Sequence, residues 1–198
     1  MLLMANKKMN NEIFMSNFRR AIALLFFSAS LLSAIPVNAE TYRNNDVEMK
    51  PVKIDINQYV GKYYEIARYP FRWEKDCTAV TATYKLLNKD TISVLNTCNK
   101  NTPTGKFISY EGEGKIVGDG KLKVSFVPIP LLKRIASGDY WVLYTSKDYT
   151  VSVVGSPNGK TGWILSKEVS IPKKELDKSL EVLKSNGYDL SKLIYTKH

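Results

Sequence analysis

The chain has 198 residues but only one histidine, His198, and two cysteines, Cys77 and Cys98. A histidine-assisted nucleophile needs a His beside a Ser or Cys, and a zinc-type metal site needs several His or Cys ligands. The composition offers neither arrangement. We therefore expect no metal site, no cofactor and no enzymatic activity.

Long apolar runs are also lacking. The longest, residues 21–32, has twelve positions, which is too few to span a bilayer. Basic residues precede this run and the small residues of 37–39 follow it, as in a cleaved secretory signal. We predict a signal peptide over residues 1–39, an arm over 40–56 and one domain over 57–198. A retained membrane anchor is the alternative. No Cys follows the run, so we expect an exported soluble protein rather than a lipoprotein.

Acidic residues are few relative to basic ones, 19 against 29, which gives a net charge of +10. Removal of residues 1–39 would remove four basic residues and one acidic residue and leave +7. The basic residues are dispersed and form no basic helix, so we expect no nucleic-acid partner. A general attraction to anionic membrane surfaces fits the charge better.

From Gly61 onward, apolar and polar residues alternate with a period of two, which predicts β-strands. Eight antiparallel strands joined mostly by hairpins favour an up-and-down barrel. A β-sandwich is the rival, but it usually needs longer crossovers. The eight predicted strands lie near residues 61–69, 78–87, 91–98, 107–117, 121–127, 139–145, 149–155 and 162–167.

One helix is predicted after the strands. Ser170 is expected to cap it, with Pro172 in its first turn and Gly187 at its end. Three Leu residues between positions 176 and 183 recur at helical spacing and make one apolar stripe. The stripe favours packing on the outside of the barrel, and a partner-binding helix is the alternative.

Two motifs point to a known family. The run from Tyr59 to Arg68 reads YVGKYYEIAR, and the last strand reads GWILSK from Gly162 to Lys167. Together with the strand pattern, they resemble the lipocalins, most of all the bacterial branch that is similar to apolipoprotein D. The resemblance implies an all-β fold: an eight-stranded antiparallel up-and-down barrel with one C-terminal α-helix packed outside. It also implies a cavity for a small hydrophobic ligand.

The chain departs from the family at the base of the barrel. Tyr63 stands where the family usually has Trp, and Lys167 stands where it usually has Arg. In the family these two groups stack and close the base, and Tyr with Lys would keep a weaker cation–π contact. We assign Gly61, Tyr63, Trp163 and Lys167 to the barrel-base motif.

Alternation along the strands also predicts which side chains face inward. Small residues would leave volume among them, while a few hydroxyl, amide and carboxyl groups would provide polar points, as in small-molecule pockets. The alternative is a solid core. The predicted ligand-binding residues are Glu65, Ala67, Tyr69, Val80, Ala82, Tyr84, Val94, Asn96, Tyr110, Val124, Phe126, Tyr140, Val142 and Val151.

The two cysteines lie at the two ends of one predicted hairpin. If it turns at residues 88–89, Cys77 faces position 100 and Cys98 faces position 79, so a disulfide would need a small bulge. It would contribute about 3 kcal/mol in the chain-entropy model. The alternative is a nucleophilic cavity thiol, as in the prostaglandin D synthase type of lipocalin.

Lipocalin topology places the loops near 70–77, 99–106, 128–138 and 156–161 around the mouth of the barrel. Two of these loops combine apolar with basic residues, which suits shallow insertion at an anionic membrane. A lid formed by Phe71 and Leu131 over the mouth is the alternative. The predicted membrane-docking rim comprises Phe71, Trp73, Ile129, Leu131, Leu132, Lys133 and Arg134.

The resemblance implies a protein that carries or stores a fatty acid or lysophospholipid for lipid handling and cell-envelope maintenance. We expect it in the periplasm, either free or at the surface of the outer membrane. The rival is a filled barrel that acts as a protein-interaction module at the membrane. The sequence leaves the natural ligand and the oligomeric state open.

Overall fold

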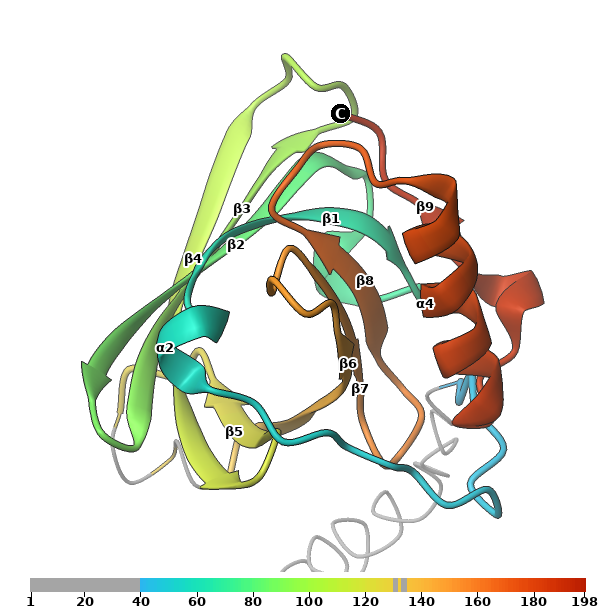
Figure 1. Cartoon of the computed structure of the whole chain (residues 1–198). Helices are drawn as coiled ribbons and strands as arrows, with labels where there is room; N and C mark the ends of the chain where they lie inside the picture. Colours follow the sequence, from blue (N-terminus) through green and yellow to red (C-terminus); the bar gives the residue numbers. More distant parts are fainter. Residues whose placement is uncertain (1–39, 130–131, 133–134) are drawn as a thin grey trace, which may run out of the picture. The chain divides into compact units, whose positions relative to one another are not determined.

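The computed structural model describes residues 40–129, 132 and 135–198 (Figure 1). The predicted signal, residues 1–39, lies outside the described residues. So do Leu131, Lys133 and Arg134 of the predicted rim.

A closed antiparallel barrel forms the body of the described domain. Each strand pairs with the next in sequence, β8 pairs with β1, and β1 pairs with β2, so the sheet closes on itself. The predicted up-and-down barrel is therefore confirmed, and a sandwich is excluded. The strands are β1 (Gly61–Arg68), β2 (Cys77–Asn88), β3 (Thr91–Lys100), β4 (Phe107–Gly118), β5 (Lys121–Ser125), β6 (Gly138–Thr145), β7 (Val151–Gly155) and β8 (Gly162–Ser166).

Several short elements join this barrel. A helical turn α2 (Ile56–Tyr59) precedes β1, and the 3-10 turn η1 (Arg72–Glu74) follows β1. A second 3-10 turn, η2 (Leu190–Lys192), follows the C-terminal helix α4 (Lys173–Ser185). A ninth strand, β9 (Ile194–Tyr195), pairs with β1 and was not predicted. Two residues are too few to show a period of two.

Helix α4 (Lys173–Ser185) packs against β6 and β7 and lies outside the barrel in Figure 1. The predicted capping role of Ser170 is wrong, because the helix begins after Pro172, whose fixed φ suits that position. Gly187 follows its end as predicted, with φ +87°, and a Cβ there would lie 2.7 Å from the Asn44 oxygen. Only glycine combines that backbone conformation with that close approach.

Two apolar clusters lie on opposite faces of the barrel wall. The inner cluster includes Tyr63, Ile92 and Leu122 from three different strands. The outer cluster joins the wall to Leu183 of α4 and to Tyr42 of the arm before the barrel. Strands β1, β6, β7 and β8 contribute residues to both clusters and thus bury both of their faces.

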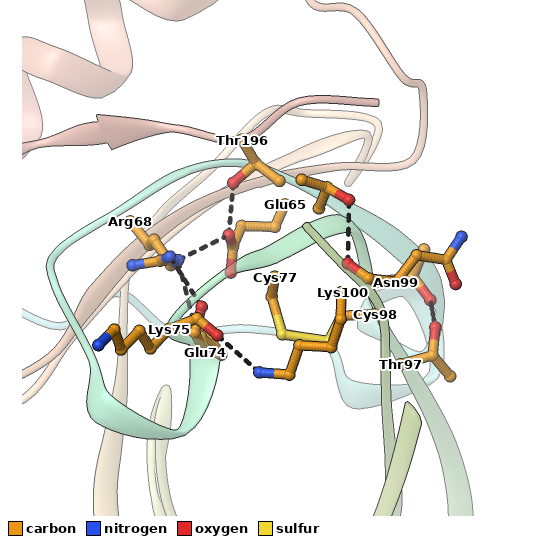
Figure 2. Close-up of a disulfide and its surroundings, with 12 residues drawn as sticks. Glu65, Arg68, Glu74, Lys75, Cys77, Thr97, Cys98, Asn99, Lys100 and Thr196 are labelled. Carbon is orange, nitrogen blue, oxygen red and sulfur yellow. Dashed lines mark hydrogen bonds and ion pairs between the residues drawn. A yellow bond between two sulfur atoms is a disulfide. The ribbon is translucent and has the colours of Figure 1, made fainter. Parts of the chain in front are cut away.

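The disulfide joins Cys77 of β2 to Cys98 of β3, with a Cα–Cα distance of 5.5 Å (Figure 2). Cys77 pairs with Lys100 as expected, and the β2–β3 register shifts between Thr78 and Thr81, which supplies the expected bulge. Both cysteines of the chain are bonded, so neither is available as the alternative nucleophile. Beside the disulfide, the Lys100 ammonium donates to the Lys75 backbone oxygen at 2.6 Å.

Candidate ligand site inside the barrel

The base of the barrel is closed by tyrosine. The Tyr63 hydroxyl donates to the Tyr59 backbone oxygen at 2.9 Å and also to the Tyr149 backbone oxygen at 3.1 Å. The Lys167 ammonium lies 5.5 Å from the centre of the Tyr63 ring and donates to the Gln58 backbone oxygen at 3.1 Å. The Tyr–Lys pair thus makes the contact expected of it at the base.

A hydroxyl network continues the floor across the barrel. Tyr140 hydrogen-bonds with Tyr59 at 2.7 Å and with Tyr84 at 3.0 Å, and Tyr59 hydrogen-bonds with Ser152 at 3.0 Å. Burial raises the pKa of the Tyr59, Tyr84 and Tyr140 hydroxyls, so all three are neutral. Because each hydroxyl has a partner, the floor is polar without an unmet hydrogen bond.

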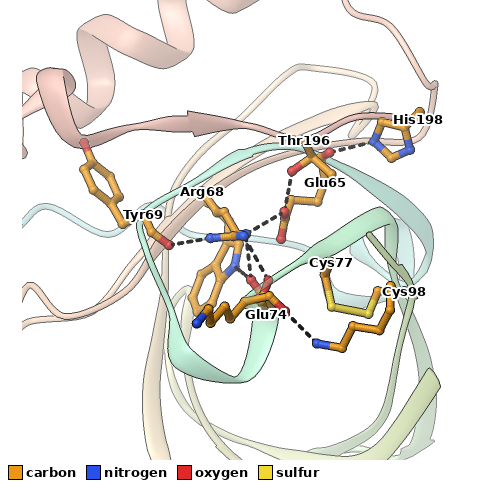
Figure 3. Close-up of polar contacts among 11 residues, drawn as sticks. Glu65, Arg68, Tyr69, Glu74, Cys77, Cys98, Thr196 and His198 are labelled. Atoms are coloured by element: carbon orange, nitrogen blue, oxygen red, sulfur yellow. Dashed lines mark hydrogen bonds and ion pairs between the residues drawn. A yellow bond between two sulfur atoms is a disulfide. The ribbon is translucent and has the colours of Figure 1, made fainter. Parts of the chain in front are cut away.

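Toward the mouth, three charged side chains meet inside the barrel (Figure 3). Arg68 Nε lies 3.3 Å from Glu65 Oε1 and 3.4 Å from Glu74 Oε2. Thr196 donates its hydroxyl to Glu65, and Trp163 donates its ring N–H to Glu74 at 3.4 Å. The cluster brings together β1, η1, β8 and the segment after β9.

Burial raises the pKa of the Glu65 carboxyl well above its usual value of 4.5, and the neighbouring Glu74 charge raises it further. Burial also raises the pKa of Glu74, although the Arg68 guanidinium opposes this. Both carboxyl groups contact the same Arg68 guanidinium, so they lie close to each other. Two carboxylates beside one guanidinium would leave an uncompensated buried charge, so the raised pKa of Glu65 favours its protonated form.

An aromatic path runs along the interior between floor and mouth. Trp163 stacks on Tyr140 with ring centres 6.4 Å apart, and the Phe71 ring meets Trp163 edge-on at 6.2 Å. Because β8 starts at the mouth, Trp163 contacts the η1 loop rather than Tyr63 and Lys167. The assignment of Trp163 to the barrel-base motif is therefore wrong. Phe71 is turned inward, as in the lid alternative, whereas Trp73 is 57% exposed with Arg72 over its ring at 4.4 Å.

One buried polar atom inside the barrel lacks a partner among the described residues. The side-chain oxygen of Asn96 is buried and accepts no hydrogen bond. Asn96 pairs with Tyr110 across β3 and β4, and Tyr110 is about half exposed. An unpaired buried acceptor destabilises the protein unless a donor reaches it, so this wall can accept a donor from a ligand.

Most residues predicted to face inward do so. Glu65 lies in the charge cluster, Val80 is buried, and Phe126 lies against Gly112, where a Cβ would meet its ring at 2.7 Å. Ligand contact by these residues stays a prediction. Those that pack in the inner cluster are Ala82, Tyr84, Val94, Val124, Tyr140 and Val142.

The inward prediction is wrong for Ala67 and Tyr69, which pack in the outer cluster against α4. The β1–β8 register shifts between Glu65 and Ala67, and one extra residue moves later side chains to the opposite face. Arg68 therefore points inside. No residue type marks this bulge in the sequence.

The inward prediction is also wrong for Val151. Ser152 reaches Tyr59 inside the barrel, which places its neighbours Val151 and Val153 on the outer face, and Val153 packs in the outer cluster. The β6–β7 register shifts between Val142 and Tyr144, so alternation counted from β6 fails in β7. Trp163 was missed as an interior residue, although alternation from Leu165 would have found it.

A concave site of about 540 Å³ is lined mostly by residues on the outer face of β2, β3 and β4. Thr83, Lys85 and Leu95 line it, together with Val127 and Pro128 from the segment after β5. Val94, Gly112 and Phe126 also line it, whereas the aromatic residues Tyr84, Tyr140, Trp163 and Phe71 do not.

The described residues contain no group of three or more His, Cys, Asp or Glu placed to hold a metal ion. Within the same part of the chain, no helix is long and apolar enough to cross a membrane.

Residues 54–198 match the family described as the Lipocalin-like domain, and the chain belongs to this family. Lipocalins bind small hydrophobic ligands. Temperature-induced lipocalin-1 of Arabidopsis thaliana is 38% identical over 74% of this chain and 81% of its own length. The outer membrane lipoprotein Blc of Vibrio cholerae is 35% identical over 75% of this chain and 86% of its own length. Apolipoprotein D of Mus musculus is 26% identical over 88% of this chain and 95% of its own length.

A solved structure supports the fold. Insecticyanin from the tobacco hornworm Manduca sexta superposes with a TM-score of 0.57 at 23% identity, covering 76% of this chain and 85% of that one.

One prediction from the sequence is contradicted by these relatives. The bacterial relatives from Vibrio cholerae, Citrobacter freundii and Escherichia coli are named outer membrane lipoproteins. The prediction that the protein is soluble and not a lipoprotein is therefore wrong by this comparison.

Proposed function

We propose that the protein binds a single-chain lipid, a fatty acid or a lysophospholipid, inside the barrel and carries or stores it for lipid handling in the cell envelope. The observation that carries the proposal is the aromatic path from Tyr84 through Tyr140 and Trp163 to Phe71. It offers an acyl chain continuous apolar contact, and the buried cluster of Glu65, Arg68 and Glu74 lies at its mouth end.

The polar end of the site suits an amphiphile. Arg68 is a buried cation inside the barrel, and the Asn96 side-chain oxygen has no donor among the described residues. Enclosing about 350 Å² of an acyl chain at about 25 cal/mol per Å² yields roughly 9 kcal/mol before the costs of association. Those costs remove several kcal/mol, which leaves an affinity of about micromolar.

A titration with an environment-sensitive fatty-acid probe tests the proposal, followed by displacement with oleate and with lysophospholipid. Ala82 faces the interior and its neighbour Thr83 lines the outer concave site, so the same substitution at both separates the two faces. We expect Ala82→Trp to weaken binding by about tenfold or more and Thr83→Trp to leave it unchanged. Equal loss in both variants, or no binding by delipidated protein, would contradict the proposal and favour the filled interaction module.

We further propose that the mouth end docks on an anionic membrane. Its support is the exposure of Trp73, Ile129, Leu132 and Ile135 in two loops at that end, together with the net positive charge. Ile135 is 81% exposed, and Val117, near the opposite end of the barrel, is 52% exposed.

This pair gives a matched test. Ile135→Ala and Trp73→Ala are expected to reduce sedimentation with phosphatidylglycerol vesicles, whereas Val117→Ala is not. Vesicle binding that all three variants retain in full would rule out docking through this end.

A further inference from the structure

The two strands at the start of the barrel separate before they reach the mouth. β1 pairs with β2 only from Gly61 to Tyr64, opposite Tyr84 to Thr81. Beyond Tyr64, the neighbours of β1 are β8 and β9. Without β9, the backbone of 65–68 would form an open strand edge in the barrel wall.

Residues 194–198, here called the strap, fill this gap. Tyr195 and Ile194 pair with Ala67 and Arg68 of β1, and the Thr196 N–H donates to the Ile66 oxygen at 3.0 Å. On its other side, the strap accepts a hydrogen bond from the Ala79 N–H of β2 at the Lys197 oxygen, at 2.6 Å. It is thus bonded to both separated strands.

The strap also contacts the buried charge cluster (Figure 3). Thr196 donates its hydroxyl to the Glu65 carboxyl, and a His198 ring nitrogen hydrogen-bonds to the Glu65 backbone oxygen at 2.8 Å. The His198 ring also meets Tyr64 edge-on at 5.7 Å. The strap therefore lies directly against Glu65, whose exposed fraction is only 2%.

The strap is held by backbone hydrogen bonds and by the polar contacts of Thr196 and His198, with few buried apolar contacts. The side chains of Ile194 and Tyr195 are 42% and 54% exposed, and β9 is only two residues long. Segments with few buried apolar contacts and short ladders open at low free energy while the rest of a protein stays folded. Neighbouring β8, in contrast, is buried over most of its length.

We propose that the strap closes a lateral portal between β1 and β2, and that the ligand passes through this portal when the strap is released. The proposal rests on the proposed binding of a lipid inside the barrel. Release would uncover Glu65 and Arg68, whose carboxyl and guanidinium groups can hydrogen-bond to a polar head group as it passes. The mouth loops would then serve as a cover, consistent with Phe71 packed on Trp163.

A locked strap separates passage through the portal from passage through the mouth. Ala67 and Tyr195 are directly opposite each other in the β1–β9 ladder, so Ala67→Cys with Tyr195→Cys is placed to form a disulfide. Mass spectrometry would verify the bond. We expect the locked protein to release a bound fatty-acid probe about tenfold more slowly than wild type. The Tyr195→Cys single variant is the matched control for loss of the tyrosine side chain, and the release rate of the locked protein is compared with that of this variant. A locked protein that exchanges ligand at the wild-type rate would overturn the portal.

A looser strap should act in the opposite direction. Thr196→Val removes the hydrogen bond to Glu65 but keeps the backbone, and we expect release several-fold faster with the melting temperature of the barrel nearly retained. Deletion of residues 194–198 should accelerate release further. Release that is unchanged in both would also overturn the proposal.

Amide hydrogen exchange tests strap opening without any ligand. The Ala79 and Thr196 amides should exchange faster than the Val94 amide of β3, and faster still in Thr196→Val. If wild type bound no probe, the proposed function would fail. Exchange at Ala79 as slow as at Val94 would independently refute the strap.

Discussion

The buried pair of carboxyl groups makes the stability of the fold depend on pH in a way that Glu65→Gln should remove. A neutral amide has the shape of a protonated carboxyl. Its oxygen can accept from Thr196 and Arg68, and its NH2 group can donate to Glu74. The variant therefore keeps the contacts of the cluster without the titration of Glu65.

The sign follows from the raised pKa. In the unfolded chain the pKa of Glu65 is near 4.5, whereas in the folded protein burial and the Glu74 charge hold it well above that value. Between these two values the folded state binds more protons than the unfolded state, so stability falls as pH rises through that window. One proton corresponds to about 1.4 kcal/mol per pH unit.

Urea unfolding measured at intervals from about pH 5 to pH 8 tests this reasoning. The free energy of unfolding of wild type should fall relative to that of Glu65→Gln, with a difference in slope approaching about 1.4 kcal/mol per pH unit. Glu111→Gln, at an exposed position on β4, is the matched control and should follow wild type. Parallel curves for Glu65→Gln and wild type would refute the assignment of a proton to Glu65.

Three further variants test the elements that hold the barrel together. Removing the disulfide by Cys77→Ser with Cys98→Ser should lower the free energy of unfolding by about 3 kcal/mol, and reduction of wild type should produce the same shift in urea midpoint. Gly187→Ala should lower the free energy of unfolding by at least about 1–2 kcal/mol because the φ of Gly187 is positive. Gly138→Ala is the control and should change the free energy of unfolding very little, because a Cβ there would meet no atom within 4 Å. Equal effects of the two substitutions would contradict the backbone strain at Gly187. Lys167→Met should lower the free energy of unfolding by about 0.5–1 kcal/mol, measured by thermal unfolding, because it removes the cation–π contact with Tyr63 at the base. An unchanged melting temperature would show that this contact contributes nothing to stability.

Strands such as β5 could be predicted because polar residues alternate with apolar ones: Lys121 and Lys123 alternate with Leu122 and Val124, as in a half-buried sheet. The disulfide followed from the same pairing, since the hairpin brought Cys77 opposite position 100. The interior face after Glu65 could not be predicted. A bulge there depends on how β1 meets β8, and the residues on both sides of it are compatible with either face.

The elements that were missed share a dependence on tertiary contacts. The start of α4 moved beyond Ser170 because Pro172 and the outer cluster, rather than a hydroxyl cap, fix its position. The two residues of β9 form a strand only because β1 offers them an edge. The buried cluster joins Arg68 at the end of β1 to Glu74 in the η1 turn, and no spacing rule relates them.

The tyrosine floor sets a fixed depth for the site. Tyr59, Tyr84 and Tyr140 are held by mutual hydrogen bonds, so they cannot move aside as aliphatic side chains would. Under the proposed function, the barrel should therefore act as a ruler for acyl chains. Affinity should rise with each added methylene until the chain reaches the tyrosines, and beyond that length the head group should be pushed away from Arg68 and out of the mouth.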